Sequence, residues 1–160
     1  MIEVSVTESV DAPPAAVWGL IGGFNNMRRW VPGVEHSTKV GDGVGAERVL
    51  LISGGAKIAE RLDSHDDAGR SYTYSYLAGP LPVSRYTTTL RVIAEGEQAC
   101  TVSWASRMEP EGLPPEEVVR LYTQLYLAGI GNIRRIMARA YATKGGAPSL
   151  QGSEGRAPNA

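Results

Sequence analysis

The sequence is poor in the residues that build disulfides, metal sites and charged binding surfaces. It has one cysteine, Cys100, which excludes an internal disulfide, and two histidines, His36 and His65, without ligand spacing. Its 16 basic and 17 acidic residues give a formal net charge of −1, which provides no electrostatic basis for binding nucleic acid. We therefore expect no metal, no cofactor and no nucleic-acid partner.

Long hydrophobic runs are also missing. The N-terminus lacks the basic and apolar regions of a signal peptide, and no stretch is long enough to cross a bilayer. A single free thiol is typical of a reducing compartment, so we expect a cytoplasmic protein without membrane insertion. The Ala-, Gly- and Arg-rich composition is typical of a GC-rich bacterial genome. A homodimer stays open at this stage.

The first third of the chain contains signals for one strand and two short helices. Segment 2–10 alternates apolar and polar residues, which predicts a half-buried strand. Asp11 lies just before Pro13-Pro14, a combination that predicts a capped helix start. Asn25 is the predicted cap of a second short helix that runs to Trp30.

From residue 34 to residue 108, strand-like runs are separated by short turn signals. These are Gly41-Asp42-Gly43, Gly54-Gly55, Asp66-Asp67-Ala68-Gly69, Gly79-Pro80-Leu81-Pro82 and Glu95-Gly96-Glu97. Links of this length join neighbouring antiparallel strands, whereas parallel strands need long crossovers. The segment predicts a meander of about six strands.

A long helix is predicted from Pro114-Pro115 to about Thr143, with Glu116-Glu117 favourably placed in its first turn. Its apolar residues recur at three- and four-residue steps and share one face: Val118, Tyr122, Leu125, Tyr126, Ile130, Ile133, Met137 and Ala140. Residues 144–160 are rich in Gly, Ser, Pro and Ala without periodicity, and predict a disordered tail behind a domain of residues 1–143.

This order of elements predicts an α+β fold. We expect a curved seven-stranded antiparallel sheet around a long C-terminal helix, with two short helices after the first strand. Only the long helix is large enough to cover the meander. A twisted sheet curled around a helix leaves room at one end for an enclosed cavity.

Strand parity places a carboxylate inside this cavity. Ile58, Glu60 and Leu62 share one face of their strand, whereas the opposite face is polar. A buried carboxylate needs a partner or a raised pKa, so Glu60 is a candidate site residue. By the same parity, Tyr86 lies on an inner face. Both faces of the strand that carries Arg48 hold aliphatic residues, so the direction of Arg48 stays open; if it points inward, it is the expected counter-charge of Glu60.

A purely structural interpretation stays open for each residue. Glu60 could lie on an edge strand or form a structural ion pair with Arg48, and Tyr86 could be an ordinary core tyrosine. Taken together, the three favour a site, because a hydrophobic core gains little from an arginine, a glutamate and a tyrosine.

The order of elements resembles the helix-grip superfamily, which includes the START domains, the birch-pollen-allergen-like proteins and the polyketide cyclases/dehydrases. Locally, "GAERVL", "AERLDSHDDAGRSYTYSY" and "SRYTTTLRV" resemble the lachrymatory factor synthases, and "ISGGAKIAERLDSHDD" resembles the abscisic acid receptors. The resemblance implies that Arg48, Glu60 and Tyr86 are a catalytic set on the cavity wall. In receptor-like terms, Ser53-Gly54-Gly55 would be a gate loop and 79–82 a latch.

The expected function is binding of a small hydrophobic molecule, with cyclisation, dehydration or isomerisation by proton transfer as its chemistry. In this scheme Glu60 is the general acid or base, Arg48 holds an anionic or carbonyl oxygen, and Tyr86 donates to a developing oxyanion. A carrier or sensor without turnover is the alternative. The residues expected to bind the ligand are Trp30, Leu50, Tyr74, Tyr76, Leu81, Trp104, Tyr122 and Tyr126.

Overall fold

A computed structural model describes residues 1–144, and its elements follow the predicted order. They are β1 (Ile2–Val10), α1 (Pro14–Ile21), α2 (Met27–Trp30), β2 (Val34–Val40), β3 (Glu47–Ile52), β4 (Lys57–Asp66), β5 (Ser71–Ala78), β6 (Val83–Ala94), β7 (Cys100–Pro110) and α3 (Pro115–Lys144). The predicted disordered tail lies outside the described residues, apart from Lys144, which ends α3.

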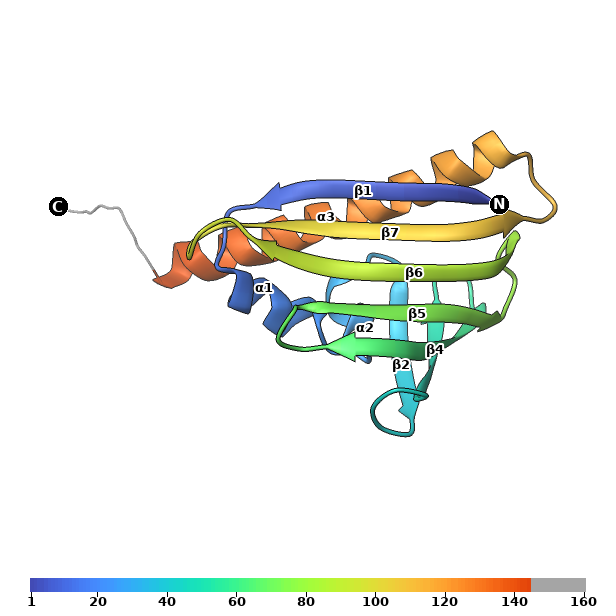
Figure 1. The fold of residues 1–160 in the computed structure, drawn as a ribbon, viewed down its shortest axis with the longest axis horizontal. Helices are drawn as coiled ribbons and strands as arrows, with labels where there is room; N and C mark the ends of the chain where they lie inside the picture. The colour runs from blue at the N-terminus through green and yellow to red at the C-terminus, as the bar shows by residue number, and fades with distance from the viewer. Residues whose placement is uncertain (145–160) are drawn as a thin grey trace, which may run out of the picture.

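The seven strands form one antiparallel sheet in the order β1-β7-β6-β5-β4-β3-β2. β2 to β7 are a meander, and β1 pairs along its whole length with β7, from Ile2 opposite Met108 to Val10 opposite Cys100. Figure 1 shows α3 lying along the β1 and β7 side of the sheet. Of the two short helices, α1 contacts β6, and α2 contacts β2 and α3. The predicted α+β helix-grip fold is confirmed.

One face of α3 is buried against the sheet. Its buried apolar residues are Val118, Tyr122, Tyr126, Ile130, Ile133 and Met137. Leu125 and Ala140, which the periodicity assigned to the same face, are exposed. On the outer side, Arg134 donates hydrogen bonds to the carbonyl of Ser9 and the carboxylate of Glu8, and thereby ties α3 to β1.

The predicted helix caps were wrong. α1 begins after Pro13, which has extended backbone and no side-chain cap, because the proline pair sets the start two residues beyond Asp11. The N-cap of α2 is Asn26 rather than Asn25, again without a side-chain cap. The Asn25 side chain instead accepts a hydrogen bond from Ser37 on β2. Both short helices are therefore held by burial rather than by capping.

Candidate functional site

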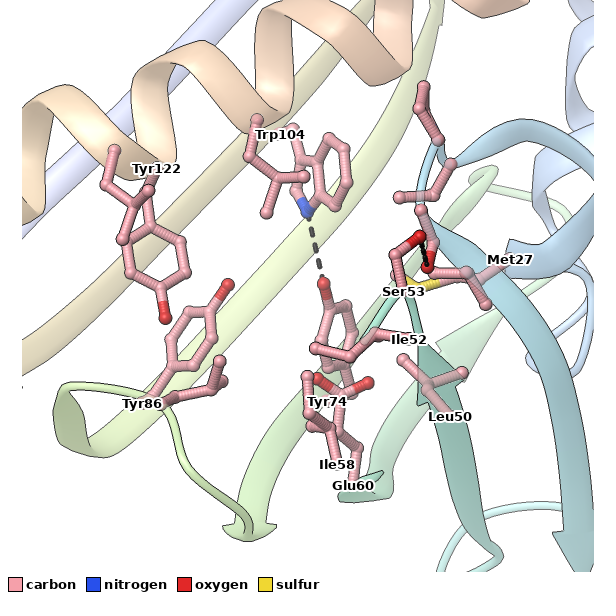
Figure 2. A pocket seen from close by; sticks show the side chains of 17 residues that line it. Met27, Leu50, Ile52, Ser53, Ile58, Glu60, Tyr74, Tyr86, Trp104 and Tyr122 are labelled. Carbon is pink, nitrogen blue, oxygen red and sulfur yellow. Dashed lines mark hydrogen bonds between the residues drawn. The ribbon is translucent and has the colours of Figure 1, made fainter. Parts of the chain in front are cut away.

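A pocket of about 320 Å³ lies between α3 and the inner face of the sheet (Figure 2). Seven residues that the sequence assigned to the site line it: Leu50, Glu60, Tyr74, Leu81, Tyr86, Trp104 and Tyr122. The other four do not line it: Trp30, Arg48 and Tyr126 are buried behind this wall, and Tyr76 is partly buried and packs against Tyr86. The periodicity of a strand or helix therefore does not give the depth at which an inward side chain lies.

The pocket opens to the surface instead of being enclosed. Its exposed lining residues are Pro32 and Gly33 before β2, Ser53 after β3, and Leu121 and Leu125 on α3. The mouth thus lies between the turn that follows α2, the β3–β4 turn and one edge of the helix. The two leucines give this mouth an apolar rim.

Glu60 and Arg48 meet because β3 and β4 place them directly opposite each other on the inner face. Arg48 Nε lies 2.9 Å and Nη2 2.7 Å from Glu60 Oε1. The guanidinium also donates to the carbonyl of Phe24, and its carbon lies 4.2 Å from the centre of the Phe24 ring and 4.6 Å from that of Tyr74. Arg48 is fully buried behind Glu60, so it positions the carboxylate and has no contact with the pocket.

Glu60 presents one free carboxylate oxygen to the pocket. Both Arg48 contacts are to Oε1, and among the described residues nothing hydrogen-bonds to Oε2. Burial raises the pKa of Glu60 above its usual value, and this effect outweighs the lowering by Arg48. A carboxyl group with these properties can accept or release a proton closer to neutral pH than a surface glutamate does.

Tyr86 lines the pocket from β6, where a β-bulge sets its direction. Between Ser84 and Thr87 the pairing with β7 shifts, and Arg85 takes a left-handed φ of 51°. Such a conformation is rare for a non-glycine residue and persists only where the surrounding structure requires it. The bulge lets Tyr86 turn inward toward α3, where its hydroxyl lies 2.6 Å from that of Tyr126.

The hydroxyls of Tyr86, on the pocket wall, and of Tyr126, behind it, are protonated at neutral pH. Burial raises the pKa of Tyr86 well above its usual value. It also raises the pKa of Tyr126 to about 12. Tyr126 donates a 2.8 Å hydrogen bond to Ser106 Oγ on β7, and so connects α3 to the sheet. These two tyrosine hydroxyls can therefore donate or accept hydrogen bonds but carry no charge.

Trp104 and Tyr74 form the middle of the wall. The indole Nε1 of Trp104 donates to the Tyr74 hydroxyl at 3.2 Å, as Figure 2 shows. Tyr126 stacks on Trp104 with ring centres 4.2 Å apart, and Trp30 packs on it at 5.0 Å. Tyr126 and Trp30 therefore support the pocket wall from behind.

Tyr76 binds the loop between β5 and β6 through a hydrogen bond. Its hydroxyl accepts a 3.2 Å hydrogen bond from the backbone N–H of Leu81, whose side chain lines the pocket. Gly79 in the same loop has a φ of 144°, and a Cβ there would lie 2.8 Å from the carbonyl oxygen of Lys57. The loop conformation thus requires glycine and is fixed by Tyr76.

Several wall residues were missed by the sequence analysis. Met27, Val31 and Leu121 line the pocket, although no motif marks them. Ser106 does not line the pocket but holds Tyr126 behind its wall, and it could have been found because it shares the inner parity of Trp104 on β7. Leu121 could not, because it lies outside the main apolar stripe of α3 and is exposed.

In residues 1–144, no group of histidine, cysteine, aspartate and glutamate side chains is arranged to hold a metal ion. Among the same residues, no helix combines the length and the apolar character needed to cross a membrane.

Solved structures similar to this chain share its fold. The protein XoxI from Bacillus cereus is 29% identical, with 88% of this chain and 98% of that one covered and a TM-score of 0.83. The Zhui aromatase/cyclase from Streptomyces sp. R1128 is 18% identical, with 90% and 98% covered and a TM-score of 0.73. Norcoclaurine synthase from Thalictrum flavum, solved with dopamine and hydroxybenzaldehyde, is 19% identical, with 86% and 87% covered and a TM-score of 0.64.

No curated protein matches the sequence. Residues 1–138, however, match the family described as polyketide cyclase / dehydrase and lipid transport. This match covers nearly all of the described fold, including every residue of the pocket. The chain therefore belongs to the polyketide cyclase/dehydrase and lipid transport family.

Proposed function

We propose that this protein binds a small hydrophobic carbonyl compound in the pocket and catalyses its cyclisation, dehydration or isomerisation by proton transfer. The observation that carries the proposal is Glu60, a pocket-lining carboxyl group with one free oxygen and a raised pKa. A buried carboxyl group is costly in a purely structural role, and such perturbed groups gather at functional sites.

The surroundings of Glu60 support proton abstraction next to a carbonyl group. Its free Oε2 takes a proton from the carbon beside the carbonyl, and the C–H electron pair moves onto the carbonyl oxygen as an enolate. A hydroxyl on the opposite wall, where Tyr86 lies, stabilises this oxyanion. The apolar wall excludes water, which strengthens both interactions.

The proton then returns from Glu60 and completes the reaction. In dehydration it is transferred to the hydroxyl group on the next carbon, which leaves as water while the enolate electrons form the new double bond. In cyclisation the enolate carbon attacks a second carbonyl group, and the proton neutralises the alkoxide that results. In isomerisation it is delivered to another carbon of the conjugated system.

The proposal is tested by deuterium exchange into a bound ketone. 2-Acetylnaphthalene in D2O exchanges its acetyl protons only through the enolate, so faster exchange in the presence of the protein reports proton abstraction. Glu60→Gln keeps the side-chain shape and an acceptor for Arg48, and is expected to slow the catalysed exchange roughly a hundredfold or more. Ketone affinity, measured by calorimetry, should change by less than about tenfold.

The double variant Arg48→Met with Glu60→Met controls for the unpaired arginine that Glu60→Gln leaves. It removes both buried charges at similar volume, and should fold but not catalyse exchange. Exchange at the wild-type rate in either variant would show that Glu60 is not the proton-transfer group.

A carrier without turnover is the second candidate. The observation in its favour is that Glu60 is the only ionisable residue other than tyrosine on the described pocket wall, and Arg48 already neutralises it. A carrier predicts tight ketone binding with no catalysed exchange in the wild-type protein, and the same assay therefore separates the two functions.

A further inference from the structure

The hydrogen-bond chain behind the pocket fixes the direction of the Tyr86 hydroxyl. A hydroxyl group has one hydrogen to donate. Tyr126 donates its hydrogen to Ser106 Oγ, so the 2.6 Å bond between Tyr86 and Tyr126 uses the hydrogen of Tyr86. Tyr86 therefore offers only lone pairs to the pocket, although the sequence predicted it as a donor.

Tyr122 has the free donor. It lies on α3, lines the pocket and is 3% exposed, and its ring meets the ring of Tyr86 edge to face at 5.3 Å. Among the described residues its buried hydroxyl has no hydrogen-bond partner. Other buried polar atoms among the described residues also lack a hydrogen-bond partner, but none of them belongs to a residue that lines the pocket.

An unsatisfied buried hydroxyl lowers stability unless something else satisfies it. Figure 2 shows the hydroxyls of Tyr122 and Tyr86 close together on the same side of the pocket, away from the carboxyl group of Glu60. Burial also raises the pKa of Tyr122, so its hydrogen is retained. A ligand oxygen at this end would accept it.

The charges of the pocket restrict the ligand further. No lysine, arginine or histidine in the described part of the chain lines it, and Glu60 is its charged lining residue. Arg48 is sealed between the rings of Phe24 and Tyr74. A ligand carboxylate would therefore meet no cation and would lie in the same apolar space as a carboxyl group, which is strongly unfavourable.

We propose that Tyr122 is the hydrogen-bond donor that holds the ligand oxygen, and that the pocket selects a neutral carbonyl compound over a carboxylate of the same shape. This inference rests on the proposed function of the pocket. It assigns oxygen binding to α3, at the opposite end of the pocket from the proton-transfer group on β4.

Three naphthalenes of nearly equal shape test the inference. 2-Acetylnaphthalene has a carbonyl acceptor, 2-isopropenylnaphthalene replaces that oxygen with carbon, and 2-naphthoate has a charged carboxylate. In the wild-type protein at about pH 8, where naphthoic acid is ionised, the ketone should bind about tenfold more tightly than the alkene. Naphthoate should bind at least about a hundredfold more weakly than the ketone.

Two matched variants locate the donor. Tyr122→Phe should reduce the preference for ketone over alkene to about twofold or less, with little change in alkene affinity, because the ring is kept. Tyr86→Phe should keep most of the preference, because the Tyr86 hydrogen is directed at Tyr126. Circular dichroism and thermal unfolding verify that both variants are folded.

The outcomes separate this inference from the proposed function. If the alkene binds as tightly as the ketone, if naphthoate binds best, or if Tyr86→Phe alone removes the preference, then the inference is wrong, while binding of apolar ligands in the pocket stands. If none of the three compounds binds the wild-type protein, both the inference and the proposed function fail.

Discussion

The buried pair of Arg48 and Glu60 links the stability of this protein to its site. Arg48 has three kinds of neighbour, the carboxylate of Glu60, the carbonyl of Phe24 and two aromatic rings. Such pairs add little to stability compared with apolar residues of the same volume, because both charges lose their hydration. The pair is therefore better explained by what it does for Glu60, which it holds at the pocket wall with Oε2 free.

Removing one partner of this pair should lower the free energy of unfolding far more than removing both. Arg48→Met leaves an unpaired buried carboxyl group and should lower the free energy of unfolding by about 3–5 kcal/mol. The double variant Arg48→Met with Glu60→Met should be more stable than the single variant and close to the wild type. Chemical denaturation measures all three proteins, and strictly additive losses would contradict the pairing.

The pair should also give a pH dependence of known sign. Because burial raises the pKa of Glu60, the folded state binds its proton more tightly than the unfolded chain does. The free energy of unfolding of the wild type, relative to the double variant, should then fall as the pH rises above the usual value of 4.5, and level off above the folded pKa. If the free energy of unfolding of the wild type, relative to the double variant, rose with pH over this range, the pKa of Glu60 in the folded protein would be lowered instead of raised.

At the scale of elements, α3 contributes both a cover for the sheet and a close contact with two tryptophans. At Gly129 an added Cβ would lie 2.8 Å from Cζ3 of Trp104 and 3.2 Å from Cζ3 of Trp30. Gly131, one half-turn further on, has no atom within 4 Å of the same position. The helix therefore approaches the pocket wall closely at one glycine and not at the other.

These two glycines predict opposite effects for the same substitution. Alanine in a helix interior normally stabilises relative to glycine by about 0.5–1 kcal/mol, so Gly131→Ala should raise the free energy of unfolding by this amount. Gly129→Ala should lower it by about 1–3 kcal/mol, because Trp104 must move. Thermal unfolding and tryptophan fluorescence measure both effects, and stabilisation by Gly129→Ala would show that the wall is loosely packed.

The helices and strands were largely predictable from the sequence. Which inward side chains line the pocket, and which lie behind them, was not. Alternation around Ile58, Glu60 and Leu62 correctly placed Glu60 inside, because a strand has a strict period of two. The same rule cannot say which of two inward side chains lies nearer the pocket. Arg48 was therefore expected to touch the ligand, although its long side chain is sealed behind Glu60 by Phe24, from a loop that carries no motif.

Hydrogen-bond direction was equally hidden in the sequence. Tyr86 and Tyr122 both point inward by periodicity, and nothing in the local sequence distinguishes a donor from an acceptor. The distinction comes from Tyr126 and Ser106, which lie on two other elements and meet only in the folded protein. Such information requires the tertiary structure, since it depends on contacts between residues far apart in the chain.

At the scale of the whole molecule, the pocket interrupts the core between the sheet and α3. The wall residues belong to α2, to α3 and to the six strands β2 to β7, together with the loops that follow α2, β3 and β5. A ligand that fills this space therefore contacts elements that separate only on global unfolding. Binding to the folded state alone raises stability in proportion to the logarithm of ligand concentration.

Ligand binding should accordingly shift the unfolding of the entire domain. 2-Acetylnaphthalene at about a hundred times its dissociation constant should raise Tm by about 5–10 °C, with one cooperative transition. 2-Naphthoate at the same concentration and about pH 8 should leave Tm nearly unchanged, because the described pocket wall has no cation for it. Differential scanning calorimetry measures both. An equal shift with the two compounds would place binding on the outer surface instead of in the pocket, and a broadened double transition would show that the helix and the sheet unfold separately.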